Sequence, residues 1–112
     1  MSVRTQVLLW TAQRVSAMVL AVCVLVHLVT VIYAVRNGLS AAEILGRTRG
    51  NVAWAGFYVV FVLAVAVHAP IGLRNVLAEH LSWRGGSLDV AVAAAALATI
   101  ALGLRAVYAV FI

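Results

Sequence analysis

The chain has 112 residues, of which 66% are hydrophobic and only 10% carry a charge, and this composition excludes an ordinary soluble domain. All eight basic residues are arginines and there are three acidic residues, which gives a formal net charge of +5. The arginines flank hydrophobic runs, as is usual at the ends of membrane segments. We therefore expect a lipid bilayer, and no nucleic acid, to be the main surroundings of the chain.

Three membrane-spanning helices are expected in chain order, each long enough to cross about 30 Å of hydrocarbon. Apart from histidines, the runs 15–35 and 50–73 contain no charged residue. The third run is rich in alanine, whose small side chain lets neighbouring helices approach closely. The expected helices cover residues 7–35, 51–79 and 88–111.

The connections between these helices are short. The first should contain an interfacial helix that ends near Gly46, because Ser40 and Glu43 have the spacing of a capping box. Connections of about a dozen residues leave no room for a soluble catalytic domain. The predicted fold is therefore all-α: one transmembrane domain of residues 1–112, a three-helix bundle completed by partner subunits.

His68 lies inside the second apolar run. An ionisable group at that depth is costly and usually serves a function, so we predict that His68 ligates a haem iron. The structural alternative is an imidazole that bonds a backbone carbonyl on a neighbouring helix. His27 in the first run stays open between a second haem ligand, a partner contact and a core residue.

Helical periodicity indicates which side chains share a face, since a residue eleven positions on returns to nearly the same side of a helix. By this rule His68 and Glu79 form one stripe on the second helix. Ser16, Cys23 and His27 form another on the first helix.

The start of the first helix and the end of the second should meet at one membrane surface. A quinone headgroup needs hydrogen-bond donors and a proton source there, and haem propionates need cations. The alternative for the two arginines of this region is snorkelling toward lipid headgroups. The polar residues concerned are Arg14, Ser16, Arg74, Glu79 and His80.

These elements resemble the membrane-anchor subunits, of the cytochrome b556 type, of succinate dehydrogenase and fumarate reductase. The family carries His-Arg-Val-Ser-Gly in its first helix, where this chain has Gln-Arg-Val-Ser-Ala from residue 13. In the second helix the family's ligand histidine is followed by glycine, arginine and an acid, matched by His68, Gly72, Arg74 and Glu79. The companion small anchor has a similar segment, so both anchor types stay open.

The resemblance implies a b-type haem held by His68, with Arg14 and Arg74 as the cations for its propionates. His27 has no family motif around it, so its role as a second haem ligand stays open. It implies a ubiquinone or menaquinone site bordered by polar and aromatic side chains. The family's site serine falls at Trp10, beside Thr11, and its propionate-binding histidines fall at Gln13 and Asn75. The implied quinone-site residues are Ser16, Glu79, His80, Thr11 and Trp10.

The resemblance also implies an iron–sulfur subunit, a flavoprotein with FAD, and a second anchor or a second copy of this chain. The location implied is a bacterial inner membrane with the N-terminus in the cytoplasm. The chain itself would be a non-catalytic subunit.

Three alternatives stay open beside this interpretation. One is a haem-free structural anchor, and another is a b-type cytochrome subunit of a different membrane dehydrogenase. A small multidrug transporter is disfavoured, because it needs a membrane-embedded carboxylate, whereas Glu43, Glu79 and Asp89 all lie near the ends of the runs.

Overall fold

The structure is a computed structural model that describes residues 1–112 and contains four helices and no strand. Three of the helices are long and apolar enough to cross a membrane, which confirms the predicted all-α membrane fold. The helices are α1 (Val3–Arg36), α2 (Ala41–Thr48), α3 (Val52–His80) and α4 (Gly86–Phe111).

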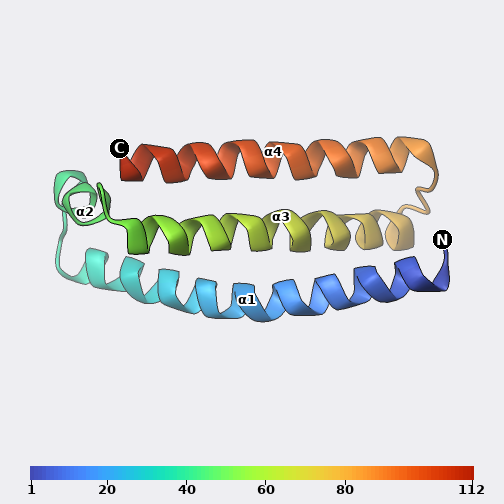
Figure 1. The fold of residues 1–112 in the computed structure, drawn as a ribbon, viewed down its shortest axis with the longest axis horizontal. Coiled ribbons are helices and arrows are strands. Elements are labelled where there is room, and N and C mark those ends of the chain that lie inside the picture. The colour runs from blue at the N-terminus through green and yellow to red at the C-terminus, as the bar shows by residue number, and fades with distance from the viewer.

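The three long helices lie side by side in one layer, with α3 between α1 and α4 (Figure 1). Successive long helices are antiparallel, so the N-terminus lies at the same end as the α3–α4 turn. The C-terminus and α2 lie at the other end. The molecule is 49 Å long, so the helix ends extend beyond a hydrocarbon core of about 30 Å into the headgroup regions.

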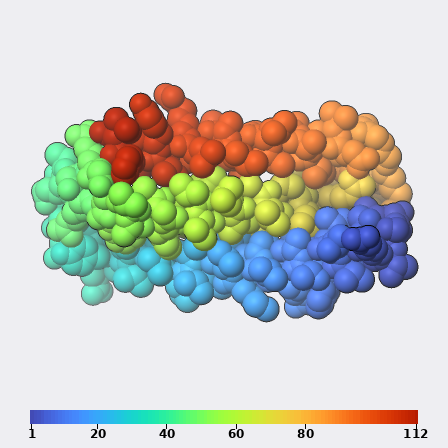
Figure 2. All heavy atoms as spheres, viewed as in Figure 1, coloured from blue at the N-terminus to red at the C-terminus, as the bar shows by residue number.

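On the face shown in Figure 2, side chains of all three long helices are exposed. Only five of the 112 residues are buried, and large apolar side chains are exposed along every long helix. In water such a surface would be a liability, whereas in a bilayer these side chains contact acyl chains or other membrane helices. Helical hydrogen bonding satisfies the backbone there without water.

Side-chain caps explain where the helices begin. Ser2 accepts a hydrogen bond from the amide of Thr5 (3.2 Å), so α1 begins at Val3, earlier than the predicted residue 7. Ser40 caps α2 by accepting from the amide of Glu43 (3.2 Å), and its hydroxyl donates to the Glu43 carboxylate (3.1 Å). The prediction of a short helix capped by Ser40 is confirmed, although α2 ends at Thr48 rather than near Gly46.

The end of α2 and the loop that follows it are hydrogen-bonded to the end of α4. The Thr48 hydroxyl donates to the carbonyl of Val110 (2.8 Å), and the amide of Gly50 donates to the carbonyl of Phe111 (2.9 Å). The last carbonyls of a helix have no partner within it, so these two bonds satisfy groups that would otherwise lie near the bilayer unpaired.

Gly103 of α4 lies directly against Val62 of α3. A Cβ atom added there would lie 2.6 Å from Cγ1 and 3.3 Å from Cβ of Val62. Rotation of the valine side chain moves the methyl groups but not its Cβ, so a larger residue at position 103 forces the helices apart. Close contact through small residues is the usual basis of helix association in lipid.

Replacing Gly103 with alanine should therefore destabilise the α3–α4 contact. We expect Gly103→Ala to lower the free energy of unfolding in detergent by about 1–3 kcal/mol, as overpacked sites do. The matched control is Gly56→Ala in α3, where an added Cβ meets nothing within 4 Å. Its effect should stay within about 0.5 kcal/mol. Equal effects of the two variants in denaturant titrations would show that helix propensity, and not packing, determines the change.

Candidate functional site

His68 lies in the interface between α1 and α3. Its Nδ1 atom is 3.4 Å from the hydroxyl oxygen of Ser16, which is only 6% exposed. Ser16 and Cys23 are the two buried residues of α1, so the stripe predicted for the first helix is the stripe that packs on α3. The His68 ring itself is half-buried.

Gln13 adds a second polar group to this interface. Its carbonyl accepts a hydrogen bond from the Ser16 hydroxyl (3.1 Å), and its side-chain Oε1 is buried without a hydrogen-bond partner. A Cβ atom on Gly72 would lie 3.4 Å from Gln13 Nε2, so the Gln13 amide packs closely against the backbone of α3 at this glycine. We call Gln13, Ser16 and His68 the interface cluster.

Toward the α3–α4 turn lies a groove of about 720 Å³. It is formed by the first turns of α1, the last third of α3 and the start of α4, and we call it the interfacial groove. Its functionally relevant lining residues are Trp10, Gln13, Arg74, Asn75 and Asp89. The groove thus combines an aromatic side chain with three side-chain amides, since Gln6 also lines it, and with two charges.

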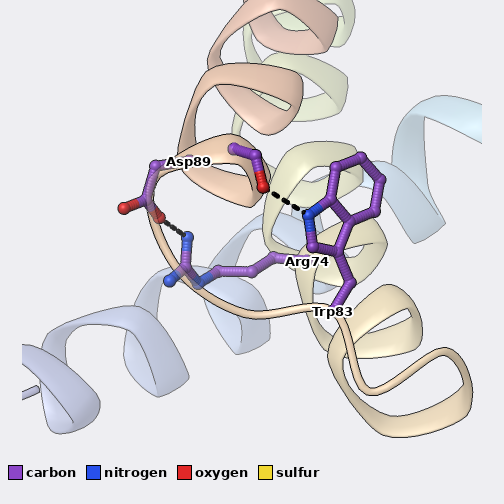
Figure 3. Close-up of polar contacts among 4 residues, drawn as sticks. Arg74, Trp83 and Asp89 are labelled. Carbon is purple, nitrogen blue, oxygen red and sulfur yellow. Dashed lines mark hydrogen bonds and ion pairs between the residues drawn. The ribbon is translucent and has the colours of Figure 1, made fainter.

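The two charges of the interfacial groove pair with each other. Arg74 Nη1 contacts Asp89 Oδ1 across the α3–α4 turn, and Trp83 Nε1 donates to the Ser87 hydroxyl (2.8 Å) in the same turn (Figure 3). Asp89 also lies in the first turn of α4, where a carboxylate complements the helix dipole. Its carboxylate therefore pairs with Arg74 and also complements the dipole of α4.

The other cation of this region, Arg14, packs against the ring of Trp10. The Arg14 guanidinium carbon lies 5.2 Å from the centre of the Trp10 ring, a cation–π contact on the exposed side of α1. Arg14 does not line the interfacial groove, whereas Trp10 and Arg74 do.

The remaining predicted quinone-site residues lie elsewhere. Glu79 and His80 are exposed at the end of α3 and do not line the interfacial groove. Thr11 is exposed and donates its hydroxyl to the carbonyl of Val7 (2.8 Å). The structure thus brings Trp10 and Arg74 together, while sequence reasoning identified Gln13 and Asn75 only as departures from a family pattern.

His27 has different neighbours from those of His68. Its Nδ1 atom is 3.4 Å from the Tyr58 hydroxyl, and its ring makes an edge contact with Phe61 at 5.8 Å between centroids. It borders two cavities of about 520 and 370 Å³ near α2. His27 lies about 16 Å beyond Ser16 along α1, so the two histidines occupy different depths in the membrane.

A haem fits the residues of the interface cluster better than a metal ion held by side chains alone. No group of three or more His, Cys, Asp or Glu residues is placed to hold an ion. A haem would ask less of the chain, because the porphyrin would supply four of the iron's ligands and the chain would need to supply only an imidazole nitrogen. In His68 only Nδ1 has a hydrogen-bond partner, which leaves Nε2 for that role.

One comparison with known proteins identifies relatives of the chain. The family model described as succinate dehydrogenase/fumarate reductase transmembrane subunit matches residues 1–108, which include both helices of the interface cluster. Comparisons with curated proteins and with solved structures returned no match.

The Arg74–Asp89 pair should contribute little to stability, because the two side chains are 29% and 59% exposed. In a double-mutant cycle with Arg74→Gln and Asp89→Asn, we expect a coupling energy of about 0.2–1 kcal/mol at low salt. Molar salt should reduce it, since screening weakens exposed charge pairs. A coupling above about 2 kcal/mol, or one that salt leaves unchanged, would mean that the pair is shielded from solvent.

Proposed function

The chain belongs to the succinate dehydrogenase/fumarate reductase transmembrane subunit family, and we propose that it binds b-type haem and helps to form the quinone site of such a complex. As a member of that family it is an integral membrane subunit that works together with other subunits. In our proposal an iron–sulfur subunit delivers electrons and a flavoprotein with FAD carries out the dicarboxylate chemistry. A second anchor, or a second copy of this chain, completes the membrane domain.

The observation that carries the haem proposal is the position of His68. An imidazole is held within a membrane-spanning helix with Nδ1 directed at Ser16 and with Nε2 free of any protein partner. Placing such a group there is costly unless it serves a function. When bound, haem would supply one-electron storage beside the quinone site. Arg14 and Arg74, two of the arginines at this end of the layer, could pair with its propionates.

The quinone proposal rests on the interfacial groove. Trp10 offers a flat surface for a quinone ring, and Arg74 and Asn75 can donate hydrogen bonds to its carbonyl oxygens. Reduction adds two electrons from the iron–sulfur subunit and two protons from the adjoining aqueous surface. The quinol hydroxyls that form could donate to Asp89, or to Gln13 after rotation of its amide.

The position of the interfacial groove also supports an orientation. We propose that the N-terminal end of α1 faces the cytoplasm of a bacterial cell, where the iron–sulfur subunit would contact the groove. Charge does not choose between the two orientations, because four arginines lie at each end of the layer. They are Arg4, Arg14, Arg74 and Arg84 at one end, and Arg36, Arg47, Arg49 and Arg105 at the other.

A haem-free anchor of the same complex is the second candidate. The observation in its favour is that Gln13 and Asn75 occupy positions where the family pattern described above has propionate-binding histidines. In that case the interface cluster would only hold α1 against α3. The spectrum of the purified complex separates the two candidates.

Removal of the His68 imidazole should abolish the haem signal. We expect the dithionite-reduced minus oxidised spectrum of the detergent-purified complex to show a b-type band that is absent in His68→Ala. His27→Ala, measured in parallel, determines whether that histidine also ligates. Leu63→Ala is the matched control, since Leu63 is an exposed side chain of the same helix and its loss should leave the band intact. A band that persists in His68→Ala would rule out His68 as the ligand.

The groove residues should matter more for quinone than the exposed residues at the end of α3. We expect Arg74→Gln to raise the KM for quinone by about 10-fold or more, because a hydrogen bond from a charged donor contributes about 1.5–3 kcal/mol. Trp10→Ala should raise it by several-fold, because stacking on an aromatic ring contributes about 0.5–1.5 kcal/mol. Glu79→Gln combined with His80→Ala should have a smaller effect. Reduction of a soluble dye by the flavoprotein provides the control for an intact complex. The reverse order of effects would place the quinone at the end of α3.

A further inference from the structure

We propose that Ser16 is a positioning residue for His68: it fixes the tautomer and the ring orientation in which Nε2 is presented to the haem iron. This inference rests on the proposed haem ligation and goes beyond it. It gives α1, beside Arg14, a second role in the haem site. It also assigns Ser16 to the haem ligand, whereas the family resemblance assigned it to the quinone site.

The hydrogen bonds of Ser16 determine the direction of the contact. A serine hydroxyl has one proton to donate and two lone pairs that accept. The carbonyl of Gln13, 3.1 Å away, takes the proton. In that arrangement the oxygen accepts from His68, whose Nδ1 is 3.4 Å away.

The consequence for the imidazole follows directly. In the neutral ring one nitrogen carries the proton and the other carries a free lone pair. If Nδ1–H donates to Ser16, the lone pair is on Nε2, which is the form that binds a metal. Ligating histidines generally donate their second ring N–H to such a partner, which fixes the ring and makes the ligand more basic.

The surroundings of Ser16 favour a fixed contact over a transient one. The residue is 6% exposed and belongs to the buried stripe of α1, so water does not compete for the hydroxyl. Its helix is continuous from Val3 to Arg36. Gly72 has no side chain, and the Gln13 amide lies beside it. A displacement of α1 relative to α3 would therefore move the partner of the His68 ring.

His27 provides the contrast within the same chain. Its Nδ1 partner is the hydroxyl of Tyr58, which makes no other hydrogen bond and can therefore either donate or accept. That contact selects no tautomer. The Ser16 hydroxyl differs because it has a carbonyl to which it donates as well as a ring nitrogen on another helix.

Thr30 supplies a matched control on α1. Its hydroxyl donates to the carbonyl of His27 (2.7 Å), the same local bond that Ser16 makes, but it reaches no ring on another helix. Thr30→Val removes this bond and keeps the shape of the side chain. It therefore measures what the loss of a local hydroxyl bond alone does to α1.

The experiment uses the whole complex, purified through a tag on this chain, with Ser16→Ala, Ser16→Thr and Thr30→Val. The measurements are haem per complex, the midpoint potential of the haem and the EPR spectrum of its ferric form. We expect Ser16→Ala to weaken haem retention roughly 10- to 100-fold, as loss of such partners does. Its remaining haem should have a higher midpoint potential, because a less basic ligand stabilises ferric iron less, and a broadened EPR signal. Ser16→Thr should restore the wild-type values, and Thr30→Val should match them.

Each other outcome decides against the inference in a recognisable way. A Ser16→Ala complex that assembles less well but has the wild-type potential and EPR spectrum would show that Ser16 only joins two helices. A wild-type complex without haem would instead refute the proposed haem ligation itself. If Ser16→Ala fails to assemble, Ser16→Cys replaces it, because the thiol has a similar size and is a weak acceptor. Wild-type haem properties in Ser16→Cys would then overturn the inference.

Discussion

The packing of α3 between α1 and α4 is the contact on which the rest of the structure depends. In lipid no hydrophobic force drives helices together, so close fit and a few polar contacts must hold them. On the α4 side the fit is made by Gly103 against Val62, and at the turn by Arg74 with Asp89. On the α1 side it is made by the buried Ser16 against His68. Every candidate site of the chain borders one of these two contacts.

In this arrangement the polar sites of the chain lie at different depths and on different faces of the helices. The interface cluster lies inside the layer, the interfacial groove opens at the end with the α3–α4 turn, and the His27 cavities lie near α2. Helical periodicity places the α3 residues of the groove and those of the cavities on opposite sides of that helix. A haem at His68 and a quinone in the groove would share α1 and α3 as walls. The same two helices would then hold both partners of an electron transfer.

Much of this fold could be predicted from the sequence, because a bilayer permits few backbone structures and the charge-free runs mark the spans. The stripe of Ser16 and Cys23 and the cap of Ser40 follow from local spacing, and both were confirmed. The partner of Arg74 could not be predicted, since it depends on a turn in which Ser82 (φ 53°) and Gly85 (φ 95°) adopt left-handed backbone conformations. The contact of Ser16 with His68 depends on the relative shift of two helices that are joined by α2 and its loops. Periodicity gives the faces of helices but not their relative heights, so Glu79 and His80 were grouped with a groove that they do not line.

Reduction of the haem by succinate tests the central claim most directly, because it requires this chain, its haem and the dehydrogenase partners to work as one complex. The complex would be isolated through a tag on this chain, and its absorption spectrum recorded before and after anaerobic addition of succinate. The account predicts a b-type band that succinate reduces to a substantial fraction of the dithionite level. A band that dithionite reduces but succinate does not would contradict it, because the haem would then not receive electrons from the dicarboxylate site.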